Sequence, residues 1–322
     1  MSTANSYSMP PTKPIEASLQ LRNPANESAT FDHLIPHPLN YYTDTLGLSL
    51  ELSSKGVALE SIFRITGVKS EFRNYKDMAS HLKSEWGPSL YNRMMTLTDE
   101  EREELTDDFK QLGMRQNLTQ ANQNWVPNTD QQLVIMIASH PMKMWKQMQE
   151  LRNWANPTIP LCKTAWLVAS PRRYPLKDVL AAPEIKEYGQ VSEILTRENT
   201  STVTQAAIIT AFFDTLFPKT SRHVIHLEHK DDYHNSGLLD YFTRQQGSLS
   251  GFTSVVLSCI QPFCPEAERI VRHFINPNAV SFRGFYSLYG GQRPARDDFV
   301  EYLYALKQFI KTDAALTAKR NR

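Results

Sequence analysis

Two apolar runs, LVIMIA (residues 133–138) and SVVLSCI (residues 254–260), are the segments on which the fold class depends. Each is short enough for a buried strand and apolar enough for part of a buried helix, and hydrophobic periodicity does not separate these two states. The surrounding sequence shows no alternation of strand and helix patterns regular enough for a doubly wound sheet. We therefore place both runs in a mainly helical protein.

Helical patterns with defined starts and stops occupy much of the chain from residue 37 onward. TLTDEEREELTDDFKQLG (96–113) begins with a capping box formed by Thr98 and Glu101 and ends at Gly113. Similar starts, stops and apolar spacings predict helices within residues 57–67, 141–157, 202–218, 264–277 and 296–311. The predicted fold class is mainly α, a helical body with short strands or extended loops.

The chain is predicted to have two parts. Residues 1–36 form a flexible polar arm, because the first 31 are rich in Ser, Pro, Thr and Asn and their few charges cancel. Residues 37–322 form the helical body. This body could consist of a shell core with an inserted segment that protrudes from it. The formal net charge of +1 gives no overall attraction to nucleic acid or anionic membrane, and no apolar run is long enough for a transmembrane helix.

Motifs of the common enzyme classes are missing from the sequence. It contains no G-x-x-x-x-G-K-[ST], G-x-G-x-x-G or H-E-x-x-H, and GSLSG (247–251) has Leu249 where a nucleophile elbow needs serine. Three sparse cysteines suit a reducing compartment rather than a disulfide framework. We assign no catalytic residue, expect no cofactor, and predict that the chain is not an enzyme.

The stretch RHVIHLEHKDDYH (222–234) carries histidines at every third position, His223, His226 and His229. The β-branched residues Val224 and Ile225 favour an extended segment, which would place His226 on the opposite face from the other two. Zinc needs three or four converging ligands, so these histidines are candidate ligands only with help from elsewhere, and we predict no bound metal. We expect them at a subunit interface, where histidine would make contacts sensitive to pH.

Two further groups of residues are candidate contact sites. Basic residues that would face RNA phosphates are Lys143, Lys146, Arg172, Arg173, Lys319, Arg320 and Arg322. In the aromatic segment FRGFYSLY (282–289), Arg283, Gly284 and Phe285 match the start of the RNP1 strand of an RNA-recognition motif, and Tyr286 and Ser287 depart from it. The segment's residues Phe282, Phe285, Tyr286 and Tyr289 therefore join the histidines as interface candidates.

The polar arm MSTANSYSMPPTKP (1–14), the helical body and the linker INPNAVSFRGFYSLYGGQRP (275–294) give the chain a resemblance to a viral family. In length and style it resembles the capsid proteins of small double-stranded RNA viruses, the partitiviruses and their cryspovirus relatives. The resemblance implies a structural protein of the virion, found also in the host cytoplasm. Such a protein forms homodimers and larger shells, encloses genomic RNA without sequence specificity, and does not bind membrane.

Two other functions remain open from the sequence. One is an RNA-coating viral nucleoprotein, whose basic groove would lie within residues 140–186, where eight basic residues stand against three acidic ones. The other is a metal-dependent enzyme built around the histidines of residues 223–234.

Overall fold

The computed structural model describes residues 52–68, 80–82, 86–115, 132–155, 161–186, 188–197, 200–228, 235–244, 251–275, 280–287 and 294–320. The predicted arm, residues 1–36, lies outside this part of the chain.

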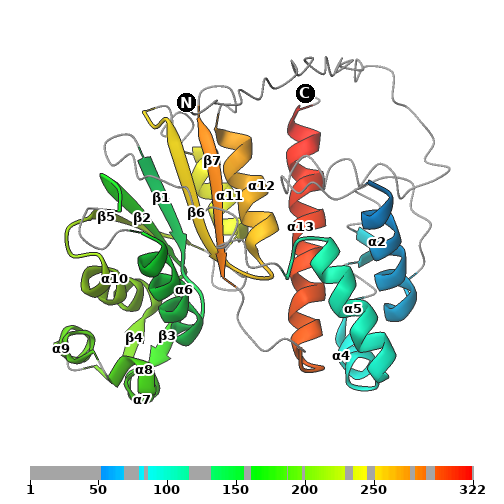
Figure 1. Cartoon of the computed structure of the whole chain (residues 1–322), viewed down its shortest axis with the longest axis horizontal. Coiled ribbons are helices and arrows are strands. Elements are labelled where there is room, and N and C mark those ends of the chain that lie inside the picture. Colours follow the sequence, from blue (N-terminus) through cyan, green and yellow to red (C-terminus); the bar gives the residue numbers. More distant parts are fainter. Residues whose placement is uncertain are drawn as a thin grey trace, which may run out of the picture.

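A parallel sheet forms the centre of the protein, so the prediction of a mainly α fold is wrong (Figure 1). Its strands, in spatial order, are β5 (Ser221–His226), β2 (Thr164–Ala169), β1 (Gln132–Ile137), β6 (Ser254–Ile260) and β7 (Ser281–Ser287). All four neighbouring pairs are parallel, with β1 paired to β2 on one side and to β6 on the other. The two ambiguous apolar runs are its central strands.

The central strands are uniformly apolar because both faces of the sheet are covered. Every residue of β1 is buried. Val134 and Met136 belong to the core on one face, whereas Leu133 and Ile135 belong to the core on the other. A strand buried on both faces has no need for polar alternation, which is why its pattern resembles that of a buried helix.

Helices lie on both faces of the sheet. One core contains residues of α6 (Pro141–Trp154), α9 (Gly189–Thr196) and α10 (Gln205–Leu216), and the opposite core contains residues of α11 (Asn235–Arg244) and α12 (Cys264–Phe274). Between β2 and α10 the chain forms α7 (Leu176–Ala181), α8 (Pro183–Lys186) and α9. It also forms a small antiparallel sheet there from β3 (Arg173–Pro175) and β4 (Thr202–Thr204).

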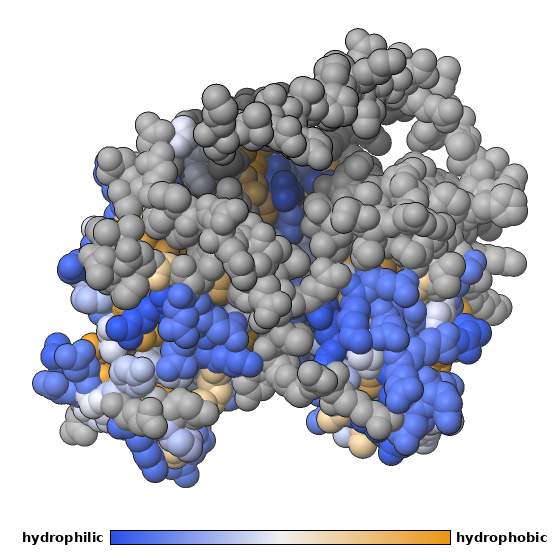
Figure 2. Space-filling model, in the orientation of Figure 1, coloured by the Kyte–Doolittle hydropathy of each residue, from blue (hydrophilic) through white to orange (hydrophobic). Residues whose placement is uncertain are grey.

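A second set of helices packs beside the sheet around its own apolar core. It consists of α2 (Leu52–Thr66), α4 (Pro88–Met95), α5 (Asp99–Gln111) and α13 (Asp298–Arg320). We call this set the helical lobe; α13 joins it to the sheet by packing against α12 (Figure 1). Hydrophilic residues cover much of the lobe's surface on the face shown in Figure 2.

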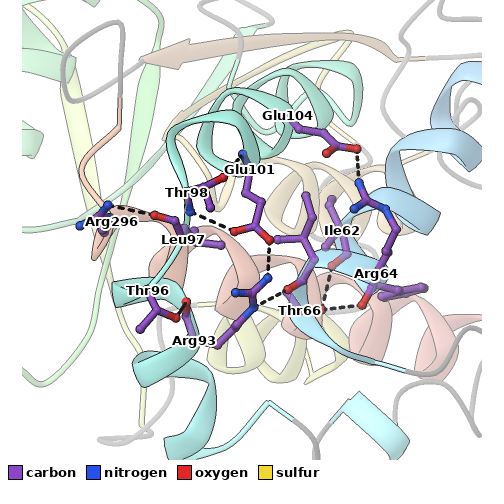
Figure 3. Close-up of polar contacts among 12 residues, drawn as sticks. Ile62, Arg64, Thr66, Arg93, Thr96, Leu97, Thr98, Glu101, Glu104 and Arg296 are labelled. Carbon is purple, nitrogen blue, oxygen red and sulfur yellow. Dashed lines mark hydrogen bonds and ion pairs between the residues drawn. The ribbon is translucent and has the colours of Figure 1, made fainter.

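Polar contacts fix the ends of the lobe's helices against one another (Figure 3). Arg93 of α4 donates from Nε to the Ile65 carbonyl at 2.9 Å and pairs with Glu101 of α5. Arg296, just before α13, donates to the Leu97 carbonyl at 2.9 Å. The start of α13 is therefore attached to the turn between α4 and α5.

The predicted carboxyl-terminal ends of α2 and α5 are confirmed, whereas α13 continues to Arg320, beyond the predicted range of 296–311. Thr98 and Glu101 form the expected capping box at the start of α5. Gly67 and Gly113 adopt positive φ angles of 74° and 75° just after α2 and α5, a backbone conformation that glycine adopts without a steric penalty. Among the described residues, no helix has both the length and the apolar character needed to cross a membrane.

The order in which successive strands are added to the sheet reverses between β1 and β6, although the strands themselves are parallel. Numbered in chain order, the strands of the sheet lie third, second, first, fourth, fifth, which is the order of the doubly wound nucleotide-binding sheets. The crossover after β1 contains α6 on one face, and the crossover after β6 contains α12 on the other. The loops that leave the carboxyl ends of β1 and β6 therefore run to opposite faces of the sheet, and a space lies between these loops.

Candidate functional site

A pocket of about 460 Å³ lies at this point of divergence. Its floor comes from the segments that follow β1, β2 and β6, and its outer wall comes from α4 and the start of α13. We call it the switch-point pocket. Its lining residues are Tyr91, Ser139, His140, Lys143, Arg172, Ile260, Phe263, Asp297, Val300, Glu301 and Tyr304.

Charged side chains of both signs line the switch-point pocket. Lys143, in the first turn of α6, donates from Nζ to both carboxylate oxygens of Glu301 at 3.0 and 3.1 Å. This partly buried ion pair connects α6 to α13 across the pocket. Arg172 lies just beyond β2, so basic groups reach the pocket from two separate crossovers.

His140 is the titratable group whose environment is most altered here. Its ring lies edge-on to Tyr174, with the ring centroids 5.6 Å apart. The loss of water around the imidazole lowers the pKa of His140, and the Lys143 ammonium lowers it further, while Glu301 acts in the opposite direction. Because the ordinary histidine pKa is already about 6.5, the imidazole of His140 is neutral at pH 7.

Apolar and aromatic side chains form most of the remaining wall. Ile260 and Phe263 follow β6, Val300 and Tyr304 lie on α13, and Tyr91 lies on α4. Tyr91 is 51% exposed, so part of its side chain is open to solvent at the pocket. The pocket therefore combines aromatic surface with a few charged groups, as small-molecule sites do.

Among the predicted RNA-facing residues whose side chains are described, two line the pocket and two lie outside it. Lys143 and Arg172 are in the pocket, whereas Lys146 lies 3.8 Å from Glu150 on α6 and Arg173 donates to Thr202 at 3.2 Å. Lys319 and Arg320 are at the end of α13, where their side chains are not described, and Arg322 lies outside the described residues.

The described histidines of the predicted group lie on β5, the edge strand that pairs with β2, and they do not line the switch-point pocket. His223 and His226 are exposed on the edge strand β5, and His226 lines a small recess beside the ion pair of Glu228 and Arg244. His229 lies outside the described residues. No set of three or more potential metal ligands is grouped within the part of the chain that the structure describes.

The predicted aromatic interface residues are mostly internal. Phe285 and Tyr286 are buried in the cores on opposite faces of the sheet, and the Tyr286 hydroxyl donates to the buried Glu268. Phe282 is partly buried beneath the Arg272 guanidinium, which lies 4.2 Å from its ring centroid. Tyr289 lies outside the described residues. Of these four, only Phe282 has a described side chain that reaches the surface.

Most of the pocket residues were missed from the sequence. Ser139 and His140 directly follow LVIMIA, and Phe263 closely follows SVVLSCI. Recognition of both runs as parallel strands would have indicated these positions, because ligands bind at the carboxyl ends of such strands. Asp297, Glu301 and Tyr304 carry no comparable signal, since they reach the pocket only through the packing of the helical lobe.

Comparison with protein-family models, with curated proteins and with solved structures finds no match for this chain.

Proposed function

We propose that the chain binds a small anionic ligand with a planar ring, of the nucleoside monophosphate class, in the switch-point pocket. The observation that carries this proposal is the position of the pocket at the reversal of a parallel sheet, with Lys143 and Arg172 beside Tyr91 and Tyr304. Parallel sheets of this strand order bind ligands at that point. A volume of about 460 Å³ is in the range of small-molecule sites.

Each part of such a ligand has a suitable partner in the pocket. The ammonium of Lys143 and the guanidinium of Arg172 are donors for phosphate oxygens. A planar base would stack on an aromatic ring, of which Tyr91 is the most exposed. The carboxylate of Asp297 would accept hydrogen bonds from sugar hydroxyls.

The turn after β1 favours a mononucleotide over a dinucleotide. Dinucleotide-binding sheets use glycines in this turn so that the backbone approaches the pyrophosphate closely. Here the turn reads ASHP (138–141) and contains no glycine. Side chains rather than backbone therefore contact the phosphate in this proposal.

Calorimetric titration of the purified chain with adenosine 5′-monophosphate tests this proposal. Double replacement of Lys143 and Arg172 by Gln should weaken binding by tenfold or more, since each loses a charged phosphate contact, on the order of 1–3 kcal/mol. The matched control replaces Lys146 and Arg173 by Gln, because these neighbours have the same charges but lie outside the pocket. Equal affinities of the two double variants would contradict the proposal.

Assembly into an RNA-enclosing shell remains a separate prediction. It now rests on the arm and on the style of the sequence, because the helical body that supported the resemblance contains a parallel sheet. Negative-stain electron microscopy separates the possibilities. Closed shells would favour a capsid, filaments rich in RNA would favour a nucleoprotein, and dispersed small particles would favour a ligand-binding protein.

A further inference from the structure

Gln205 is a buried polar residue at the junction of two of the loops that form the pocket floor, those after β1 and β2. It is the first residue of α10, and its side chain has no exposed surface. Its position does not serve to cap α10, because the Thr204 hydroxyl already accepts the hydrogen bond from the Ala207 amide. The side chain of Gln205 is therefore available for contacts outside its own helix.

The contacts of Gln205 join the loop after β1 to the loop after β2. Its Oε1 accepts hydrogen bonds from the amide and the hydroxyl of Ser170 at 2.8 and 2.9 Å. Its Nε2 donates to the Ser139 carbonyl at 2.9 Å, and its backbone amide donates to the Arg172 carbonyl at 2.8 Å. One residue thus makes four hydrogen bonds to the segments that carry His140 and Arg172.

We infer that Gln205 is a positioning residue, which holds His140 and Arg172 in the geometry that the ligand requires without touching the ligand itself. The inference rests on the proposed function for its ligand, although the loop geometry it describes exists without one. Arg172 lies two residues after Ser170, and His140 directly follows Ser139. A small displacement of either loop therefore moves a pocket side chain directly.

The experiment compares Gln205→Met with Gln132→Met. Gln132 is a control because it is also a buried glutamine, and its side chain joins β1 to the segment before β2 by donating to the Leu161 carbonyl at 3.1 Å. It is the first residue of β1, at the opposite end of the strands from the pocket. Both variants leave buried backbone groups without partners, so both should lower Tm, and Gln205→Met should lower it more because it removes three side-chain hydrogen bonds.

Only Gln205→Met should alter the pocket. We expect the Kd for adenosine 5′-monophosphate to rise by about tenfold or more in Gln205→Met and by less than about twofold in Gln132→Met. A second measurement needs no ligand: the titration of His140 followed by NMR. Its ring faces Tyr174, Lys143 and Glu301, so displacement from them should move its pKa toward the ordinary value in Gln205→Met alone.

The two measurements separate failure of the inference from failure of the proposed function. If the unaltered chain binds no nucleotide but the His140 titration changes only in Gln205→Met, the ligand assignment falls and the positioning role stands. If the two variants give the same titration and the same Kd, the positioning role is overturned. Should Gln205→Met not fold, Gln205→Glu keeps the acceptor for Ser170, removes the donor to Ser139, and is judged by the same two outcomes.

Discussion

Asp108 shows how a single buried group makes stability depend on pH. This residue of α5 is only 5% exposed, and one oxygen of its carboxylate has no hydrogen-bond partner. Burial raises the pKa of Asp108 to about 7, against the effect of a hydrogen bond from Ser61. The folded protein therefore favours the neutral carboxyl, and stability is lost as the pH rises from about 4 to above 7.

Replacement of Asp108 by Asn should stabilise the protein above neutral pH, because Asn mimics the neutral carboxyl. The expected gain in the free energy of unfolding at pH 8 is on the order of 2–4 kcal/mol, falling toward zero near pH 4. Urea unfolding at a series of pH values measures it. The control is Asp107→Asn, whose side chain is 66% exposed and should change little. A pH-independent difference for Asp108→Asn would contradict this account.

If the pocket binds an anion as proposed, Glu301 should limit the strength of that binding. The Glu301 carboxylate already accepts hydrogen bonds from the Lys143 ammonium, so a phosphate would have to compete with it for that ammonium. Glu301→Gln should therefore strengthen binding of adenosine 5′-monophosphate by about threefold to tenfold, on the order of 1 kcal/mol. Glu150→Gln, two turns further along α6 beside Lys146 and outside the pocket lining, is the control and should leave affinity unchanged. Weaker binding by Glu301→Gln would argue against anion contact at Lys143.

Among the elements, the helices with clear start or stop residues were predictable, whereas α4, α7, α8, α9, α11 and most of the strands were not. Helix ends need specific residues, such as Thr98 before α5 or Pro141 at the start of α6, and these are visible in the sequence. A parallel strand covered on both faces needs only apolar residues, so LVIMIA and TAWLVA (164–169) carry no period of their own. The edge strand β5 was better indicated, because Val224 and Ile225 correctly favoured an extended segment.

The capping box of α5 gives a prediction at the level of the element. Thr98→Ala removes the acceptor for the Glu101 amide and should cost about 1 kcal/mol in the free energy of unfolding. The other half of the box is the hydrogen bond from the Thr98 amide to the Glu101 carboxylate, which lowers the pKa of Glu101. The stabilisation from this second bond is present above about pH 4.5 and is lost at lower pH. Thermal unfolding measures the effect. Thr96→Ala is the control, because that exposed hydroxyl caps no helix start; equal losses would contradict the role of the cap.

At the scale of the whole molecule, the switch-point pocket exists only through long-range packing. Its residues come from five separate segments, and Tyr91 and Tyr304 are more than two hundred residues apart. The sequence identified Lys143 and Arg172 as exposed basic candidates, but it gave no sign that α4 and α13 would close over them. Such a site becomes predictable only once the strand order is known, because the order decides which loops meet.

The central claim is that the reversal between β1 and β6 is a site for a nucleotide-like anion. A crystal structure of the chain soaked with adenosine 5′-monophosphate tests it most directly. We predict the phosphate within hydrogen-bonding distance of Lys143 or Arg172 and the base against an aromatic ring of the pocket. A nucleotide bound anywhere else, or a pocket that stays empty at saturating nucleotide, would contradict the claim.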